Sequence, residues 1–238
     1  MSKGQAKKGK KSRSSDGLII VIGLIAVMLA IGLIALNGLS GATPVSQADG
    51  SASGGNAGAG LELCGGKPCP SQGAADAPVT MIEVSDYACS HCRDYNLGKA
   101  ARLEDAYVKT GKVRYISHIF ALRPETKPAA AAAWCAYEQG KYWEFHHEAY
   151  ANQPQGRDPN TDDFLKWGSA IGVDQTQYAG CVNSGKYAQD VSLSALEADR
   201  AGVSGTPTFF INGRVVQGDA SLEQFYSTID AALAKAGK

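Results

Sequence analysis

The sequence predicts an α/β domain that is interrupted by a block of helices and preceded by one transmembrane helix. Three observations carry this prediction: an uncharged apolar run near the amino end, a strand–helix–strand pattern after it, and a strand–strand–helix pattern at the carboxyl end. Helical periodicity fills the roughly 80 residues between the two patterns. Residues 61–238 are the size of a single domain.

The composition is that of an ordinary globular protein. Apolar residues make up 44% of the chain and charged residues 19%, and the formal net charge is zero. Proteins that bind nucleic acid usually carry a basic surplus, so we expect no nucleic-acid partner. The charge is unevenly placed, because residues 1–17 form a basic tail with six of the 23 cationic residues: Lys3, Lys7, Lys8, Lys10, Lys11 and Arg13.

The run Leu18–Leu36 holds 19 residues without a charge, about the length of a membrane-spanning helix. The basic tail precedes this run and the next basic residue is Lys67, so we expect the amino terminus in the cytoplasm and the later domain outside the cell membrane. A cleaved signal peptide is the alternative, since small residues typical of cleavage sites occur at 40–42 and 46–48. Either way, the domain reaches a compartment that permits disulfides.

Residues 37–60 are dominated by Gly, Ala and Ser, and we expect them to form a flexible linker. In the domain that follows, 79–84 reads as a buried strand and 113–120 as a second strand. Between them we expect one helix, from about Cys89 to Thr110, that ends at Gly111.

The helical block starts with an Ala-rich helix that has Pro128 in its first turn and Gly140 after its end. Further helices are expected at about 141–151, 161–171, 175–183 and 186–201. Strands at 208–211 and 214–217 then flank Asn212-Gly213, a pair typical of a two-residue type I′ turn. Ser221 and Gln224 read as a capping box at the start of the last helix, whose expected buried face is Leu222, Phe225, Ile229 and Ala232.

Cys89 and Cys92 lie where the first strand meets its helix. The free N–H groups and the dipole of a helix N-terminus favour a thiolate, so we expect Cys89 to be the exposed attacking sulfur. Cys92 lies one turn further on and should be more buried. His91, between them, can donate a hydrogen bond or a positive charge to the thiolate. Because a stabilised thiolate favours the reduced form, the disulfide form should be a strong oxidant.

On these residues the sequence resembles the DsbA-like thiol-disulfide oxidoreductases, a branch of the thioredoxin superfamily with helices inserted into a thioredoxin-like fold. The resemblance covers about residues 75–236. It rests on the Cys-Ser-His-Cys motif at 89–92, on Glu83, on Thr206-Pro207 and on the place of the insertion at about 125–202. It implies that Glu83 is a buried acid that manages the proton of Cys92. It also implies that Thr206-Pro207 is a cis-proline segment that faces the redox pair and holds substrate backbone.

The resemblance implies a protein-disulfide oxidoreductase that forms disulfides in exported proteins and needs no cofactor. A quinone-linked membrane partner would reoxidise the cysteine pair. Ser90 replaces the proline of the best-known members, which leaves the redox potential open. A reductase or isomerase with the same centre is therefore the alternative.

Four cysteines remain. Cys135 and Cys181 both lie in the helical block, where a disulfide would staple the insertion, and Cys64 and Cys69 can close a local loop. The second pair could instead relay electrons from Cys92. A third hypothesis is a zinc-stabilised binding module, because the spacing of Cys64, Cys69, Cys89 and Cys92 is close to that of a zinc ribbon. Further along the chain, His118 reads as a structural residue, and the neighbouring His146 and His147 should point to different faces of a helix.

Overall fold

The computed structural model describes residues 58, 60–218 and 220–237. The basic tail, the predicted span at 18–36 and nearly all of the linker lie outside these residues. Among the helices that the structure describes, none is both long and apolar enough to cross a membrane.

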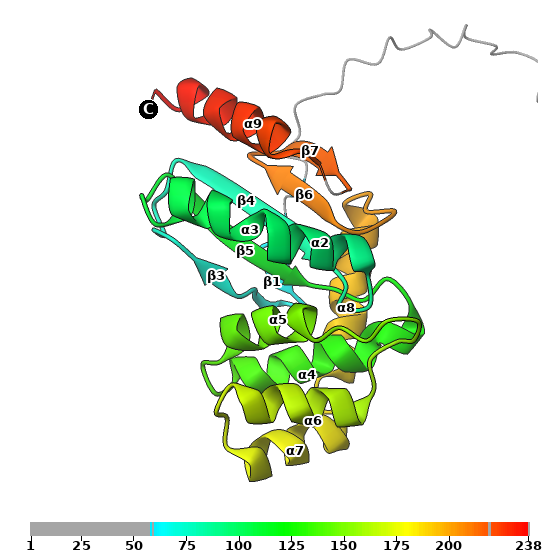
Figure 1. Cartoon of the computed structure of the whole chain (residues 1–238). Helices are drawn as coiled ribbons and strands as arrows, with labels where there is room; N and C mark the ends of the chain where they lie inside the picture. Colours follow the sequence, from blue (N-terminus) through cyan, green and yellow to red (C-terminus); the bar gives the residue numbers. More distant parts are fainter. Residues whose placement is uncertain (1–57, 59, 219, 238) are drawn as a thin grey trace, which may run out of the picture. The chain divides into compact units, whose positions relative to one another are not determined.

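A five-stranded sheet forms the centre of the fold (Figure 1). Its strands lie in the order β3-β5-β4-β6-β7, with β4 and β5 parallel and the other neighbours antiparallel. Their bounds are Ser71–Gln72 for β3, Val79–Ser85 for β4, Val113–Ile119 for β5, Thr208–Ile211 for β6 and Arg214–Gln217 for β7. Asn212 and Gly213 both have positive φ, of 43° and 83°, as a type I′ turn requires.

Three short strands were not predicted. Leu63–Cys64 (β1) and Lys67–Pro68 (β2) form a separate hairpin, and β3 adds an edge strand beside β5. Each has only two residues, too few to show the alternation by which a strand is recognised in a sequence.

The predicted single helix over 89–110 is wrong. The structure has α2 at Ser90–Gly98, α3 at Ala100–Leu103 and a π-helical turn at Glu104–Val108. The first break follows Gly98, and glycine is a poor helix former. The chain still reverses at Gly111, whose φ is +73°.

The helices between β5 and β6 confirm the predicted insertion. After a 3₁₀ turn at Pro124–Thr126 they run Lys127–Tyr137 (α4), Tyr142–Ala151 (α5), Thr161–Ala170 (α6), Gln175–Ser184 (α7) and Ala188–Arg200 (α8). The last helix, α9, spans Leu222–Lys235, and the Ser221 hydroxyl accepts the N–H of Gln224 at its start. Its buried face includes Thr228 and Leu233, whereas Leu222 and Ala232 are only partly buried.

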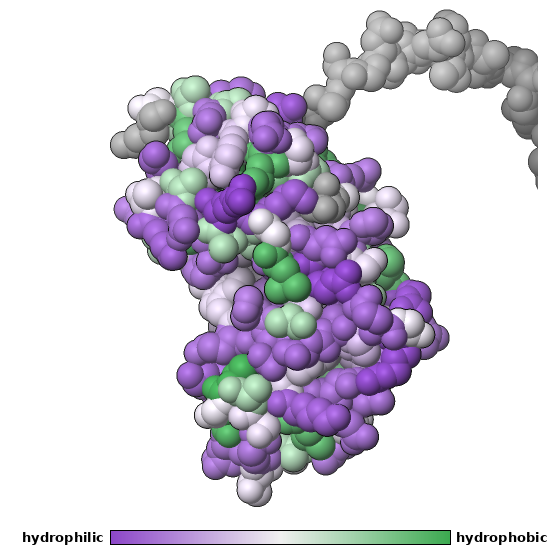
Figure 2. All heavy atoms as spheres, viewed as in Figure 1, coloured by the Kyte–Doolittle hydropathy of each residue, from purple (hydrophilic) through white to green (hydrophobic). Residues whose placement is uncertain are grey.

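Side chains leave the central strands toward two cores. On one face, Met81 and Tyr115 pack with residues of α2, α3 and α9. On the other, Ile82 and Ile116 pack with the helical insertion and with the β1–β2 hairpin. The surface seen in Figure 2 is mostly hydrophilic, with apolar residues in small separate groups. The sheet therefore separates two environments, and the residues that follow lie on one or the other.

Candidate active site

The end of β4 and the start of α2 present the Cys89 and Cys92 thiols. Cys89 is the residue just before the helix, with extended backbone (φ −87°, ψ 120°), and its side chain is partly exposed. Cys92 lies one turn into α2 and is fully buried. Neither is in a disulfide, so the structure describes the reduced pair.

The surroundings of Cys89 favour its thiolate. The hydrogen bond from the Cys92 thiol, helped by the Thr206 side chain and by the backbone N–H groups of Cys92 and His91, lowers the pKa of Cys89 to about 5. Partial burial opposes this shift but does not cancel it. At neutral pH, Cys89 is therefore a thiolate that is accessible to a disulfide.

The surroundings of Cys92 have the opposite effect. Burial and the adjacent Cys89 sulfur raise the pKa of Cys92 well above its ordinary value. Cys92 therefore keeps its proton and donates it in a hydrogen bond to Cys89. Cys89 can therefore react as a thiolate at neutral pH, whereas Cys92 must first lose its proton to an acceptor.

The loop before β6 faces Cys89. The Thr206–Pro207 peptide bond is cis, and the carbonyl oxygen of Thr206 lies 3.3 Å from the Cys89 sulfur. This loop is brought to the pair because β6 runs antiparallel to β4, with Thr208 opposite Val84.

Glu83 lies on β4 and is fully buried. Its carboxylate accepts hydrogen bonds from the Tyr115 hydroxyl and, over 2.8 Å, from the side-chain amide of Asn96. Burial raises the pKa of Glu83, and these hydrogen bonds offset only part of the shift. Glu83 thus exchanges a proton closer to neutral pH than an exposed glutamate does.

Asn96, on α2, connects Glu83 to the backbone of Cys92. Its amide nitrogen also donates to the backbone carbonyl of Cys92 at 3.0 Å, one turn earlier in α2. Its amide oxygen lies 2.9 Å from Nε2 of His146, on α5 of the insertion. The other ring nitrogen of His146 contacts the hydroxyls of Tyr87 and Tyr142, at 3.1 and 3.2 Å. The result is a buried polar network around Glu83.

Two further side chains hold the turn that carries Cys89. The Asp86 carboxylate accepts the N–H groups of Ala88 and Leu122 and the hydroxyl of Thr126, all within 2.7 Å. The side-chain amide of Gln153, which follows α5, donates to the carbonyls of Tyr87 (2.8 Å) and Cys89 (3.1 Å).

His91 is exposed, and its backbone N–H contributes to the lowered pKa of Cys89. The imidazole of His91 is not among the main causes of the lowered pKa of Cys89. The stabilisation of the Cys89 thiolate by a charge on His91 therefore stays a prediction. Ser90, also exposed, opens α2.

The other four cysteines form two disulfides. Cys135 of α4 is bonded to Cys181 of α7, 46 residues later, and Cys64 is bonded to Cys69 across the β1–β2 hairpin. The hypothesis of a zinc ribbon made of Cys64, Cys69, Cys89 and Cys92 is wrong for this fold. Among the described residues, the group of potential ligands that does come together is Cys64, Cys69 and His118, without the pair in α2.

A family model described as thioredoxin matches residues 67–231. The chain belongs to the thioredoxin family. Its structure resembles the crystal structure of oxidised BdbD from Bacillus subtilis, with a TM-score of 0.65 and 20% identity, over 70% of this chain and 93% of that one. It also resembles DsbA from Chlamydia trachomatis, with a TM-score of 0.63 and 17% identity, over 68% of this chain and 90% of that one. At these identities the likeness establishes the fold.

Sequence relatives of this thioredoxin-family chain differ in length. A Na(+)/H(+) antiporter NhaA 3 from Salinispora tropica is 34% identical over 173 residues, which are 69% of this chain and 25% of the relative. A probable disulfide bond formation protein D from Bacillus cereus is 29% identical over 174 residues, which are 69% of this chain and 79% of the relative. The chain thus spans about a quarter of the length of the antiporter relatives.

Several members of the site were missed in the sequence, among them Asn96, Asp86, His146 and Gln153. Asn96 could have been found, because it lies four residues after Cys92 on the same helix and such residues share a face. Asp86, His146 and Gln153 gave no such signal, since their contacts depend on how the loops and the insertion meet the turn before α2.

Proposed function

We propose that this chain is an extracytoplasmic protein-disulfide oxidoreductase that forms disulfides in exported proteins through Cys89 and Cys92. The observation that carries the proposal is the contrast between the two thiols: a partly exposed Cys89 with a pKa lowered to about 5 beside a buried Cys92 with a raised pKa. A stabilised thiolate favours the reduced form, so the disulfide form gains oxidising power. The name of the Bacillus cereus relative also supports this class of reaction.

In the proposed reaction, a thiolate of the substrate attacks Cys89 of the Cys89–Cys92 disulfide and forms a mixed disulfide. Cys92 leaves as a thiolate and takes up a proton. The second thiol of the substrate loses its proton, attacks the substrate sulfur of the mixed disulfide and releases Cys89 as a thiolate. The substrate loses two electrons and becomes a disulfide, and the enzyme pair gains both.

Glu83 is the proposed proton donor and acceptor for Cys92. Cys92 is buried and needs a proton when it leaves and an acceptor when the pair is oxidised again. The carboxyl of Glu83, also buried and with a raised pKa, is linked to the Cys92 backbone through Asn96. Thr206 and Pro207, beside Cys89, are the proposed binding segment for substrate backbone.

The proposed location follows from the sequence. The span at 18–36, with the basic tail before it, would place the catalytic domain outside the cell membrane, and residues 37–60 would tether it. A membrane redox partner would reoxidise the pair. Protease treatment of intact spheroplasts should digest residues 61–238 of the membrane-bound chain. A soluble mature chain that starts near Thr43 or Asp49 would show cleavage instead.

The direction of the reaction is tested by redox titration of the purified full-length chain in glutathione buffers. Alkylation and mass analysis then give the fraction of Cys89 and Cys92 that is oxidised. We expect a potential well above the value of about −270 mV that is typical of thioredoxin. A value near −270 mV would overturn the oxidase proposal in favour of a reductase. Parallel readings for Cys135 and Cys181 show whether the titration reports only the active pair.

A further inference from the structure

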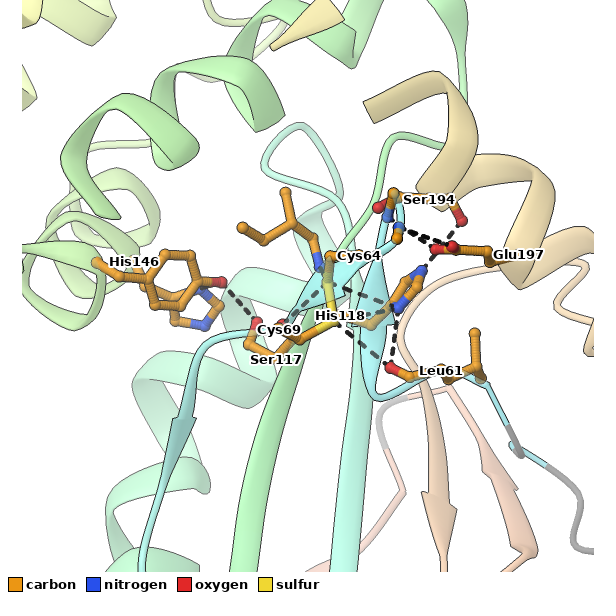
Figure 3. The surroundings of a disulfide bond; sticks show 12 residues. Leu61, Cys64, Cys69, Ser117, His118, His146, Ser194 and Glu197 are labelled. Carbon is orange, nitrogen blue, oxygen red and sulfur yellow. Dashed lines mark hydrogen bonds between the residues drawn. A yellow bond between two sulfur atoms is a disulfide. The ribbon is translucent and has the colours of Figure 1, made fainter. Parts of the chain in front are cut away.

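The Cys64–Cys69 disulfide of the β1–β2 hairpin packs against a histidine of β5, on the face of the sheet opposite Glu83. Nδ1 of His118, on β5, lies 3.7 Å from the Cys64 sulfur and 3.6 Å from the Cys69 sulfur (Figure 3). All three side chains are buried. We propose that Cys64, Cys69 and His118 form a redox-gated zinc site, which is closed as a disulfide and binds Zn²⁺ when the two cysteines are reduced.

The spacing of these atoms fits zinc. Bond lengths of about 2.3 Å to sulfur and 2.0 Å to nitrogen place the sulfur and nitrogen ligands of a tetrahedral zinc about 3.5 Å apart. The observed distances from Nδ1 to the two sulfurs, 3.7 and 3.6 Å, are close to that value. Four residues between the cysteines also lie within the usual spacing of a zinc-binding cysteine pair. Reduction must open the sulfur–sulfur bond, and the two sulfurs must then move apart to about 3.8 Å, the separation of two sulfur ligands at a tetrahedral zinc.

The second nitrogen of His118 is already held as in a metal site. Nε2 lies 3.0 Å from the carbonyl oxygen of Ser194 on α8, so an N–H at Nε2 leaves the lone pair of Nδ1 facing the sulfurs. Histidines that bind metals usually donate their other N–H to such an acceptor.

A carbonyl oxygen also faces Nδ1. The Leu61 oxygen lies 3.0 Å from Nδ1 and 3.5 Å from the Cys69 sulfur. A neutral imidazole has one N–H, yet a carbonyl oxygen faces each of its nitrogens. With the N–H at Nε2, the lone pair of Nδ1 faces a lone pair of the Leu61 oxygen. A cation between Nδ1, the two sulfurs and the Leu61 oxygen relieves this contact, and the oxygen can serve as the fourth ligand.

The hairpin has contacts that hold it without its disulfide. The Glu197 carboxylate on α8 accepts the N–H groups of Gly65 (2.8 Å) and Gly66 (3.1 Å), which lie between the two cysteines. Lys67 forms an ion pair with Asp190, also on α8, at 2.9 Å. The backbone N–H of Ile119 points at the Cys64 sulfur at 3.1 Å, where it would stabilise a thiolate. These contacts keep both sulfurs beside His118 after reduction.

Opening the site needs two electrons, which a dithiol supplies. The dithiol is oxidised to its own disulfide, and Cys64 and Cys69 become thiols. Zn²⁺ then displaces one proton from each thiol, and both protons go to solvent.

The test uses the full-length chain with Cys89→Ser and Cys92→Ser, which removes a thiol pair that could compete for zinc. The protein is reduced with a phosphine, freed of it without oxygen, and titrated with Zn²⁺ or Co²⁺. We expect one equivalent of zinc per chain after reduction and none before, and a cobalt spectrum typical of tetrahedral sulfur and nitrogen ligands. A reduced chain that binds no zinc would overturn the proposal.

Two controls assign the ligands. His118→Asn in the same background should weaken zinc binding at least tenfold, whereas His147→Asn, at an exposed histidine, should leave it unchanged. Unchanged affinity in His118→Asn would overturn the assignment of the third ligand. If His118→Asn does not fold, alkylation of the parent chain decides. Zinc should slow the alkylation of Cys64 and Cys69 but not of Cys135 and Cys181, and equal rates with and without zinc would contradict the site.

Discussion

The Nε2 atom of His146 lies 3.7 Å from Oε2 of Glu83, and both side chains are buried. The two do not form an ion pair at neutral pH, because burial lowers the pKa of His146 to about 3. A neutral His146 lets the carboxyl of Glu83 keep its raised pKa, since no positive charge opposes the effect of burial. The helical insertion therefore helps to set the proton affinity of an acid that lies on the sheet.

Glu83→Gln should slow the exchange of Cys92 at least tenfold, because an amide cannot give or take a proton and general acid–base groups contribute about 10² or more. Stopped-flow measurement of mixed-disulfide formation from pH 5 to 8 gives the rate, because this is the step in which Cys92 leaves and takes up a proton. Glu125→Gln, at an exposed carboxylate, is the matched control. Equal rates for wild type and Glu83→Gln across this range would make Glu83 a bystander.

The same substitution should affect stability in a pH-dependent way. The pKa of Glu83 is higher in the folded chain than in the unfolded one, so its contribution is fully present below the unfolded pKa and is lost as pH rises through the folded pKa. Glu83→Gln should therefore gain stability relative to wild type as pH rises from 4 to 8. Urea unfolding at both values measures this difference. A difference that does not change with pH would contradict the raised pKa.

His146→Phe should destabilise the fold. It leaves the Asn96 amide oxygen and the two tyrosine hydroxyls beside the ring without their histidine partner. A buried polar group without a partner costs about 1–3 kcal/mol. His147→Phe is the matched control, since His147 lies next to His146 on α5 but is exposed. Denaturant unfolding compares the two variants, and equal stability would mean that the network is dispensable.

Thr206→Val should raise the pKa of Cys89, because it removes a buried hydroxyl that can stabilise the thiolate and helps to lower that pKa. A hydrogen bond to a charged group is worth about 1.5–3 kcal/mol, which is about one to two pKa units. The pH dependence of iodoacetamide labelling gives the value, with a midpoint near 5 expected for wild type. Should the midpoints coincide, the hydroxyl of Thr206 plays no part.

Replacing Cys135 and Cys181 with Ala should lower the free energy of unfolding by about 4 kcal/mol, on the loop-entropy estimate for a loop of this length. The Cys89–Cys92 pair should keep its exchange activity in an insulin-type assay, because this disulfide joins α4 to α7 within the insertion. Lost activity at unchanged stability would contradict a purely structural role.

The elements that could be predicted are those with a signal in their own residues. Asn212-Gly213 specified its turn, and the start of α9 followed from Ser221. Gly98 also carries a local signal, since glycine is a poor helix former, but the prediction of one helix over 89–110 did not take it into account. The hairpin at 63–68 depends instead on long-range contacts, such as that between Gly65 and Glu197.

The site divides in the same way. The position of Cys89 before a helix predicted the direction of its pKa shift, because the backbone N–H groups at a helix N-terminus act locally. The partners of Glu83 come from α2, β5 and α5, so their convergence depends on packing. His118 shows the limit most clearly, since its strand was predicted but its place beside the Cys64–Cys69 disulfide was not.

The Gln153 amide limits how this chain can be recombined with others. It supplies donors to the carbonyls of Tyr87 and Cys89, so a chimera in which the insertion is exchanged or deleted would leave those carbonyls bare beside the reactive sulfur. The helical insertion and the turn that carries Cys89 therefore form one structural unit. A chimera that exchanges the insertion must therefore keep Gln153 or provide another side-chain amide at the same position.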